Sequence, residues 1–183
     1  MDDVSELQLW QQSMRGDGRA FGAIFDLHQR RLYLAALRVS ETATDAEDLV
    51  AATFLELWKR RNTVRVVEGS VLPWMLVTLN NLGRNAARAT RRHRRFLSTL
   101  PEPATADVAL DRVEELHAQR DAMRLLRSLP STDAAILALT AFEGLSASEA
   151  AAALGISAQT ARSRLSRARR RAQLHVAPEG STS

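Results

Sequence analysis

The chain has 183 residues, which gives room for one or two small domains, and its 45% hydrophobic content excludes a wholly disordered protein. It has no cysteine, so disulfides and thiolate metal sites are excluded, and its four histidines lack the spacing of metal ligands. The formal net charge is only +4, but residues 84–95 and 162–171 each hold six arginines and no carboxylate, which indicates a polyanion contacted twice.

The N-terminal segment is acidic where a secretory signal would be basic, and no apolar run approaches the ~20 residues that cross a bilayer. We therefore expect a cytoplasmic protein. Apolar residues at helical spacing predict a first helix: Val4, Leu7, Trp10 and Met14. The Gly-Asp-Gly sequence at residues 16–18 ends this pattern.

A second helix is predicted from about Arg19 onward. Its apolar stripe consists of Phe21, Ile24, Phe25, His28, Leu32, Ala36 and Val39. His28 lies on this stripe, and no catalytic partner for it is evident in the sequence. We therefore interpret it as a histidine of the core or its boundary with a satisfied hydrogen bond.

Thr44 with Glu47 three residues later is a capping box, which predicts the start of a third, amphipathic helix. Its apolar residues are Leu49, Val50, Thr53, Phe54, Leu57 and Trp58. The carboxylates of Asp45, Glu47 and Asp48 allow a metal-dependent nuclease as an alternative. Acidic residues are favoured in a first helical turn in any case, and no distant acid or histidine completes such a site.

Residues 62–70 lose helical periodicity and predict a loop, after which Pro73 suits the first turn of a long fourth helix. An unbroken helix over residues 73–95 would be about 34 Å long at ~1.5 Å per residue. One face, expected to be the core side, carries Leu76, Leu79, Leu82 and Ala86. The other face carries Trp74, Val77, Thr78, Asn81, Asn85 and Arg88.

The second face of this helix combines an aromatic ring, amides and arginines. These groups can stack on unpaired bases, bond their edges and hold phosphates, so the face is a candidate for binding single-stranded nucleic acid. For Trp74 alone, a place in the core is an equally good interpretation.

Two prolines with small and acidic residues mark residues 96–109 as a linker between two domains. A helix is predicted over residues 110–128. Ser131 or Thr132 is expected to cap another helix, which bears Ile136, Leu139 and Phe142 and ends at Gly144.

Residues 146–171 predict a helix-turn-helix. Ser146 with Glu149 is a capping box, Gly155 suits the turn because it can adopt a left-handed conformation, and Ser157 caps a second helix from Ala158. A buried seam is expected at Ala161, Leu165 and Ala168. The outward residues can bond bases or phosphates in a major groove: Gln159, Thr160, Arg162, Ser163, Ser166, Arg167 and Arg170. The alternative is an ordinary solvated arginine face near a helix C-terminus.

Four segments in this order resemble a group IV, or extracytoplasmic-function (ECF), bacterial sigma factor. They read RLYLAALR (31–38), DAEDLVAATFLELW (45–58), PWMLVTLNNLGRN (73–85) and LP…AFEGLSASEAAAALGISAQTARSRLSRAR (129–169). The resemblance implies an all-α protein with two helical domains, residues 1–95 and 113–175, joined by a linker at 96–112 and followed by a tail at 176–183. It implies no enzymatic activity and no cofactor.

By this resemblance, the chain would bind the clamp and flap regions of the RNA polymerase core and direct it to promoters, and would be nucleoid-associated when so bound. The polymerase contacts implied are Asp45, Glu47, Asp48, Leu49, Phe54 and Trp58. The contacts to the melted downstream element are Trp74, Asn81, Arg84, Asn85, Arg88, Arg91 and Arg92. Among these, Asn81 would hold a flipped base together with the loop that precedes Pro73. The helix from Ser157 would read the upstream element as duplex, with Arg162, Ser163, Ser166 and Arg167 foremost.

Some positions depart from the family pattern: Ala51 and Ala52 replace a common Gln-Glu pair, and Asn85 replaces a frequent aspartate. An anti-sigma factor is a further candidate partner. The short tail leads us to expect no extra C-terminal regulatory domain. Two alternatives remain: an autonomous dimeric helix-turn-helix regulator, which would bind its operator without polymerase, and a recombinase or nuclease, which would need a nucleophile or metal ligands.

Overall fold

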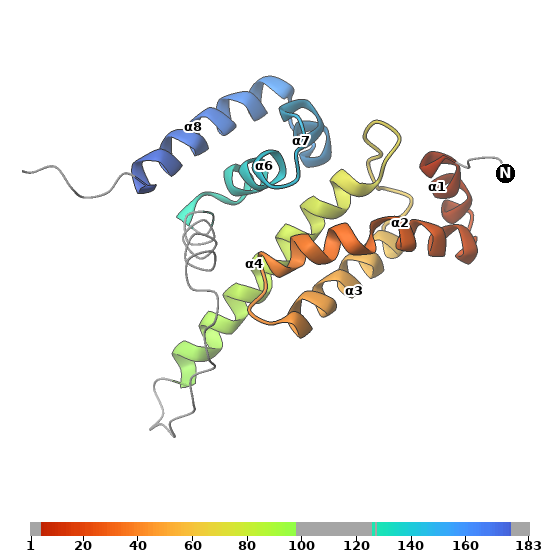
Figure 1. The fold of residues 1–183 in the computed structure, drawn as a ribbon, viewed down its shortest axis with the longest axis horizontal. Helices are drawn as coiled ribbons and strands as arrows, with labels where there is room; N and C mark the ends of the chain where they lie inside the picture. The colour runs from red at the N-terminus through yellow and green to blue at the C-terminus, as the bar shows by residue number, and fades with distance from the viewer. Residues whose placement is uncertain (1–4, 98–125, 127, 177–183) are drawn as a thin grey trace, which may run out of the picture.

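A computed structural model describes residues 5–97, 126 and 128–176. In that part of the chain the fold is all-α, as predicted, with seven helices in two groups (Figure 1). The N-terminal group comprises α1 (Glu6–Met14), α2 (Gly18–Leu37), α3 (Ala43–Lys59) and α4 (Leu72–Leu97). The C-terminal group comprises α6 (Ser131–Ala141), α7 (Ala147–Leu154) and α8 (Ala158–Val176). Most of the predicted linker and of the helix at 110–128 lies outside the described residues.

The N-terminal group packs α2, α3 and α4 side by side, with α1 across one end (Figure 1). Large side chains from each of these helices are almost completely buried: Trp10, Ile24, Leu32, Leu57, Met75, Leu76 and Leu79. Burying one such side chain stabilises the fold by about 1.5–3 kcal/mol. His28 is also buried, at 5% exposed, and is hydrogen-bonded, so the interpretation of a satisfied core histidine is confirmed.

Two predicted helix starts were wrong. The capping box of α3 is Thr42 with Asp45, whose carboxylate accepts hydrogen bonds from the Thr42 N–H at 3.1 Å and hydroxyl at 2.7 Å. The predicted Thr44–Glu47 pair has the same spacing and satisfies the same local rule, but the helix begins two residues earlier. At α6, neither Ser131 nor Thr132 is the cap, because the extended Pro130 starts the helix without a side-chain hydrogen bond.

The helix α4 runs unbroken to Leu97, two residues into the predicted linker. Its expected faces were partly wrong, since Val77 is buried and Ala86 is exposed. The reason is that α4 is covered on several sides, by α2, α3, α6 and α7, so its first two turns have almost no free face. Leu76 and Leu79 are in the core as expected.

The C-terminal group has a core formed mainly by Leu129, Ile136, Leu137, Ala161, Leu165 and Ala168. The predicted seam of α8 is thereby confirmed. Asp133 of α6 is also buried, and its carboxylate accepts a hydrogen bond from Arg164 of α8 at 2.9 Å. This ion pair joins α6 to α8 and orients Arg164 away from the outward face of α8.

The two groups also pack against each other, because α4 contacts both α6 and α7 (Figure 1). Leu139, Leu145, Ala150 and Ala153 of the C-terminal group belong to the same apolar cluster as the core of the N-terminal group. Among the described residues, no helix combines the length and apolar character that a membrane crossing requires.

Candidate nucleic-acid and protein interfaces

The helix-turn-helix is built as the sequence predicts. The Ser146 hydroxyl accepts a hydrogen bond from the Glu149 N–H at 3.1 Å, while the Glu149 carboxylate accepts one from the Ser146 N–H at 2.7 Å. Hydrogen bonding of the Glu149 carboxylate to the Ser146 side chain, and secondarily to the Ser146 backbone N–H, lowers the pKa of Glu149 below its usual value. Gly155 closes α7 in the left-handed conformation at φ 70°, and the Ser157 hydroxyl caps α8 at 3.1 Å from the Thr160 N–H.

The outward face of α8 has all of its predicted residues exposed: Gln159, Thr160, Arg162, Ser163, Ser166, Arg167 and Arg170. Arg162, Ser166 and Arg170 also line a hollow between α8 and the start of α7, together with Arg169. Sequence reasoning did not include Arg169, although its position three residues after Ser166 places it on the same side of the helix. This surface presents arginines and hydroxyls without an opposing carboxylate among its lining residues.

The basic face of α4 is only partly free. Asn81, Asn85, Arg88, Arg91 and Arg92 are exposed as a nucleic-acid contact requires. Trp74, in contrast, is half-buried and packs against the apolar core, which leaves only part of its ring for stacking.

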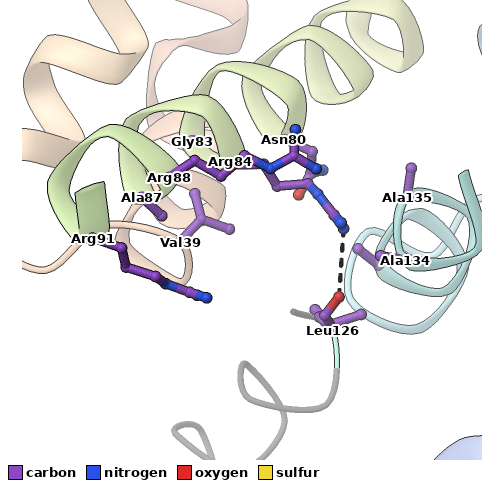
Figure 2. Close-up of a pocket in the computed structure, with 11 residues that line it drawn as sticks. Val39, Asn80, Gly83, Arg84, Ala87, Arg88, Arg91, Leu126, Ala134 and Ala135 are labelled. Carbon is purple, nitrogen blue, oxygen red and sulfur yellow. Dashed lines mark hydrogen bonds between the residues drawn. The ribbon is translucent and has the colours of Figure 1, made fainter. Parts of the chain in front are cut away.

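Arg84 is bound within the protein (Figure 2). Its guanidinium donates to the carbonyl oxygens of Leu126 at 3.4 Å and Leu129 at 3.2 Å. Burial, and secondarily the charge of Arg88, lowers the pKa of Arg84 from its usual value. The adjacent cavity of about 100 Å³ lies between α4 and α6 and is lined by Arg88 and Arg91 in addition. Arg84 is thus a contact between the two helical groups in this structure.

Further arginines of the N-terminal group reach the C-terminal group. Arg31 and Arg38 of α2 both form ion pairs with the carboxylate of Glu143, whose side chain is 6% exposed. Arg31 also donates to the Glu143 carbonyl oxygen, and the Arg38 guanidinium lies 5.6 Å from the centre of the Phe142 ring. Arg65, in the loop before α4, lies against Gly155 in the helix-turn-helix. No sequence motif indicates these contacts, which in the case of Glu143 join residues more than 100 positions apart.

The position of Arg65 beside Gly155 bears on the expected effect of Gly155→Ala. Gly155 and Gly144 both have φ 70°, where an alanine costs about 1–2 kcal/mol, but only at Gly155 does a new Cβ meet another group, 2.5 Å from an Arg65 nitrogen. The atoms that the Cβ would meet are the far end of the exposed, flexible Arg65 side chain, which can move aside at little cost. Urea unfolding should therefore show a similar loss of about 1–2 kcal/mol for Gly155→Ala and for Gly144→Ala, set by the left-handed backbone. An unchanged stability in either variant would contradict this.

The acidic start of α3 leaves the carboxylates of Asp45, Glu47 and Asp48 exposed. Asp45 is at the same time part of the capping box. Leu49 and Phe54, which the resemblance implied as interface residues, are in the core at 8% and 5% exposed. Of the predicted polymerase contacts, the three carboxylates and part of the Trp58 ring are therefore accessible to a partner, whereas Leu49 and Phe54 belong to the core. No three acidic, histidine or cysteine side chains form a metal-binding group in the described part of the chain.

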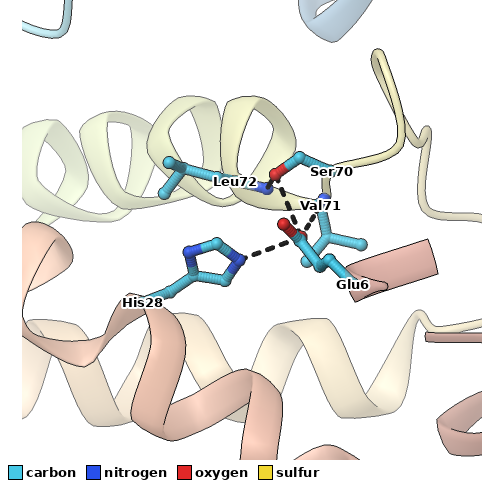
Figure 3. Close-up of polar contacts among 5 residues, drawn as sticks. All are labelled: Glu6, His28, Ser70, Val71 and Leu72. Atoms are coloured by element: carbon cyan, nitrogen blue, oxygen red, sulfur yellow. Dashed lines mark hydrogen bonds and ion pairs between the residues drawn. The ribbon is translucent and has the colours of Figure 1, made fainter. Parts of the chain in front are cut away.

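A partly buried polar cluster around Glu6 was not anticipated from the sequence (Figure 3). One carboxylate oxygen, Oε1, lies 2.9 Å from His28 Nε2 and accepts hydrogen bonds from the Ser70 hydroxyl at 2.9 Å and the Val71 N–H at 2.8 Å. The cluster joins α1, α2 and the junction between the loop and α4. Only the polarity of His28 on an apolar stripe could have indicated that a partner was needed.

The Glu6 cluster predicts a pH-dependent contribution to stability. Burial raises the pKa of Glu6, but the hydrogen bonds from His28, Val71 and Ser70 outweigh burial and leave the pKa below the usual 4.5. The stabilisation is therefore fully present above about pH 4.5 and is lost as the pH falls through the lower pKa of the folded protein. Urea unfolding of wild type and Glu6→Gln should show a difference that is constant near neutral pH and shrinks in acid. A difference that persists unchanged in acid would contradict this.

Comparisons with known proteins give a consistent picture. The family description Sigma-70 region 2 matches residues 24–93, and Sigma-70, region 4 matches residues 119–171. The RNA polymerase sigma factor NccH of Alcaligenes xylosoxydans xylosoxydans is 31% identical over 170 residues, which cover 88% of this chain and 89% of that protein. The ECF RNA polymerase sigma factor SigE of Mycolicibacterium smegmatis is 33% identical over 84% of this chain.

The probable RNA polymerase sigma factor RfaY of Xanthomonas campestris pv. campestris is 32% identical over 84% of this chain. The chain spans only 40% of the length of RfaY and 60% of that of SigE. Among solved structures, CnrH in complex with the cytosolic domain of CnrY has the same fold, with a TM-score of 0.66, 23% identity, and coverage of 97% of this chain and 100% of that one. The sigma factor RpoE from Bartonella quintana, in complex with the anti-sigma factor NepR, has a TM-score of 0.57 and 25% identity, covering 87% and 98%.

Proposed function

The chain belongs to the ECF-type RNA polymerase sigma factors, with sigma-70 regions 2 and 4, and on this premise we propose that it binds the polymerase core and directs it to promoters. Sigma factors are transcription initiation factors without catalytic activity of their own. The observation that carries the proposal is the presence of two separate basic surfaces in one chain, on α4 and on α8.

The C-terminal domain, residues 113–175, reads the upstream promoter element as duplex in this proposal. Its support is the exposed arginine and hydroxyl face of α8. A helix of this kind fits the major groove, where arginine can bond two acceptors of a guanine. Arg162 and Arg167 are the residues we assign to base or phosphate contacts first, with Ser163 and Ser166 between them.

The N-terminal domain, residues 1–95, captures the downstream element as it melts. The exposed amides of Asn81 and Asn85 bond base edges, and Arg88, Arg91 and Arg92 hold the backbone. The loop at residues 62–70 lies at the start of the same helix and cradles the flipped base with Asn81. The exposed carboxylates at the start of α3 attract a basic surface of the polymerase and orient the complex.

The closed arrangement of the two helical groups is a resting state in this proposal. Arg84 is directed toward the C-terminal group while it donates to the carbonyl oxygens of Leu126 and Leu129, so it is less available to DNA in this state. Binding of the polymerase core separates the domains and releases Arg84. Because RpoE of Bartonella quintana forms a complex with an anti-sigma factor, we extend the same kind of partner to this chain, as a protein that favours the closed state.

Transcription with purified components tests this function. Core polymerase is mixed with the protein and with fragments of the source genome, and the 5′ ends of the transcripts are mapped. We expect initiation at a limited set of sites that share two sequence elements and that depend on the protein. Initiation that is the same with and without the protein would overturn the proposal.

A further inference from the structure

The start of α4 has no carboxylate of its own. Val71, the residue before the helix, has no side-chain acceptor, and the first turn contains no acidic residue. A helix start leaves N–H groups without partners and carries a partial positive charge, both of which favour a nearby carboxylate. Glu6 supplies that carboxylate from α1, 65 residues away in sequence, through its 2.8 Å hydrogen bond from the Val71 N–H.

The same carboxylate oxygen also fixes the end of the loop. The Ser70 hydroxyl donates to Glu6 at 2.9 Å and accepts a hydrogen bond from the Leu72 N–H at 3.1 Å. Ser70 is in turn paired with Val67 by two backbone hydrogen bonds of 2.9 and 3.0 Å. Glu68 and Gly69 between them have φ values of 50° and 82°, which makes a tight two-residue turn.

The position of the carboxylate is fixed from the opposite side by His28, which is buried on α2. The Glu6 side chain is itself only 16% exposed, so water competes weakly for its hydrogen bonds. Three elements that are separate in sequence, namely α1, α2 and the loop with α4, therefore meet at one oxygen atom (Figure 3).

We propose that Glu6 is a positioning residue for recognition of the downstream promoter element, because it sets the junction between the loop at residues 62–70 and α4. This inference rests on the proposed function. Asn81 lies ten residues after Val71 on a continuous helix, or about 15 Å at ~1.5 Å per residue. A shift of the junction therefore moves the loop relative to Asn81 and changes the shape of the site that receives the flipped base.

The test uses the full-length protein with core polymerase and one promoter identified in the transcription experiment. The variants are Glu6→Ala, Glu6→Gln and Ser70→Ala, with Gln11→Ala on the exposed side of α1 as the matched control. Four quantities are measured: affinity for core, binding to the upstream element, permanganate reactivity of unpaired thymines, and discrimination against single-base changes in the downstream element.

For Glu6→Ala we expect affinity for core and binding to the upstream element to stay within about twofold of wild type. Discrimination against single-base changes in the downstream element should fall roughly tenfold, because the charge-assisted hydrogen bonds to the Glu6 carboxylate are lost. Glu6→Gln retains an acceptor oxygen and should restore part of the discrimination. Ser70→Ala, which removes the hydroxyl's hydrogen bonds with Glu6 and Leu72 but keeps the bonds of Glu6 with His28 and the Val71 N–H, should lose part of it. Gln11→Ala should behave as wild type.

Unchanged discrimination in Glu6→Ala, or a parallel loss of core affinity and discrimination, would overturn the positioning role. If Glu6→Ala does not fold, Ser70→Ala is the deciding variant. Wild-type discrimination in Ser70→Ala would then overturn the positioning role of Glu6. Failure of the wild-type protein to initiate at any promoter would instead contradict the proposed function, so the two failures are distinguishable.

Discussion

Replacing Arg162 and Arg167 together by alanine is expected to abolish recognition of the upstream element while leaving the protein folded. Both side chains are exposed and neither has an ion pair that stabilises the fold among the described residues. A well-formed arginine contact to a base is worth about 1–3 kcal/mol of discrimination, so the two losses predict a decrease of roughly a hundredfold in promoter-specific initiation. Initiation is measured on a promoter that has the upstream element and on one in which it is scrambled.

The matched control is Arg15→Ala with Arg19→Ala, which removes the same charge from the N-terminal group, where both residues are exposed. The control pair should initiate as wild type does. The single variants Arg162→Ala and Arg167→Ala separate the roles of the two arginines. Losing a phosphate contact lowers the slope of log affinity against log salt concentration by about one, whereas losing a base contact relaxes specificity. Equal losses in the control pair would mean that net charge is all that matters.

Replacing Glu143 by glutamine is expected to open the closed state of the free protein. The carboxylate is buried and pairs with both Arg31 and Arg38, so its removal weakens the contact between the two helical groups. Because Arg31 and Arg38 remain partly exposed, water replaces part of the lost ion-pair energy. We therefore expect the ratio of open to closed molecules to rise roughly tenfold. With Arg84 released, the free protein should bind single-stranded downstream element several-fold more tightly.

The population is measured as a distance distribution between labels on Ala89→Cys and Ala152→Cys. Both positions are exposed and the chain has no cysteine of its own, so the labels react only there. Glu56→Gln is the matched control, because Glu56 pairs with Lys59 and Arg60 within α3 or at its end. A single short distance in Glu143→Gln, identical to that in wild type, would contradict the role of Glu143 in closure.

Sequence reasoning succeeded where the determinants are close together in the chain. The capping box at Ser146, the turn at Gly155 and the buried seam of α8 each depend on residues within one or two helical turns. The start of α3 was predicted wrongly because two overlapping pairs, Thr42 with Asp45 and Thr44 with Glu47, satisfy the same local rule, and the sequence alone does not choose between them.

What the sequence could not predict are contacts between distant segments. Glu6 and Ser70 are 64 residues apart, and neither carries a motif that indicates the other. Arg84 is the residue type expected at a DNA contact. It is held instead by two backbone carbonyl groups, which occur in every sequence and therefore give no signal. Val77 was placed on the wrong side of α4 because helical periodicity assumes one buried face, whereas α4 is covered from several directions.

The most direct test of promoter recognition by two separate surfaces is a footprint of one promoter with the protein alone and with the protein bound to core polymerase. With core, we predict protection of upstream duplex by α8 together with permanganate-reactive thymines in the downstream element; without core, we predict neither. Strong upstream protection by the protein alone, combined with no unpaired thymines when core is present, would contradict the account and favour an autonomous DNA-binding regulator.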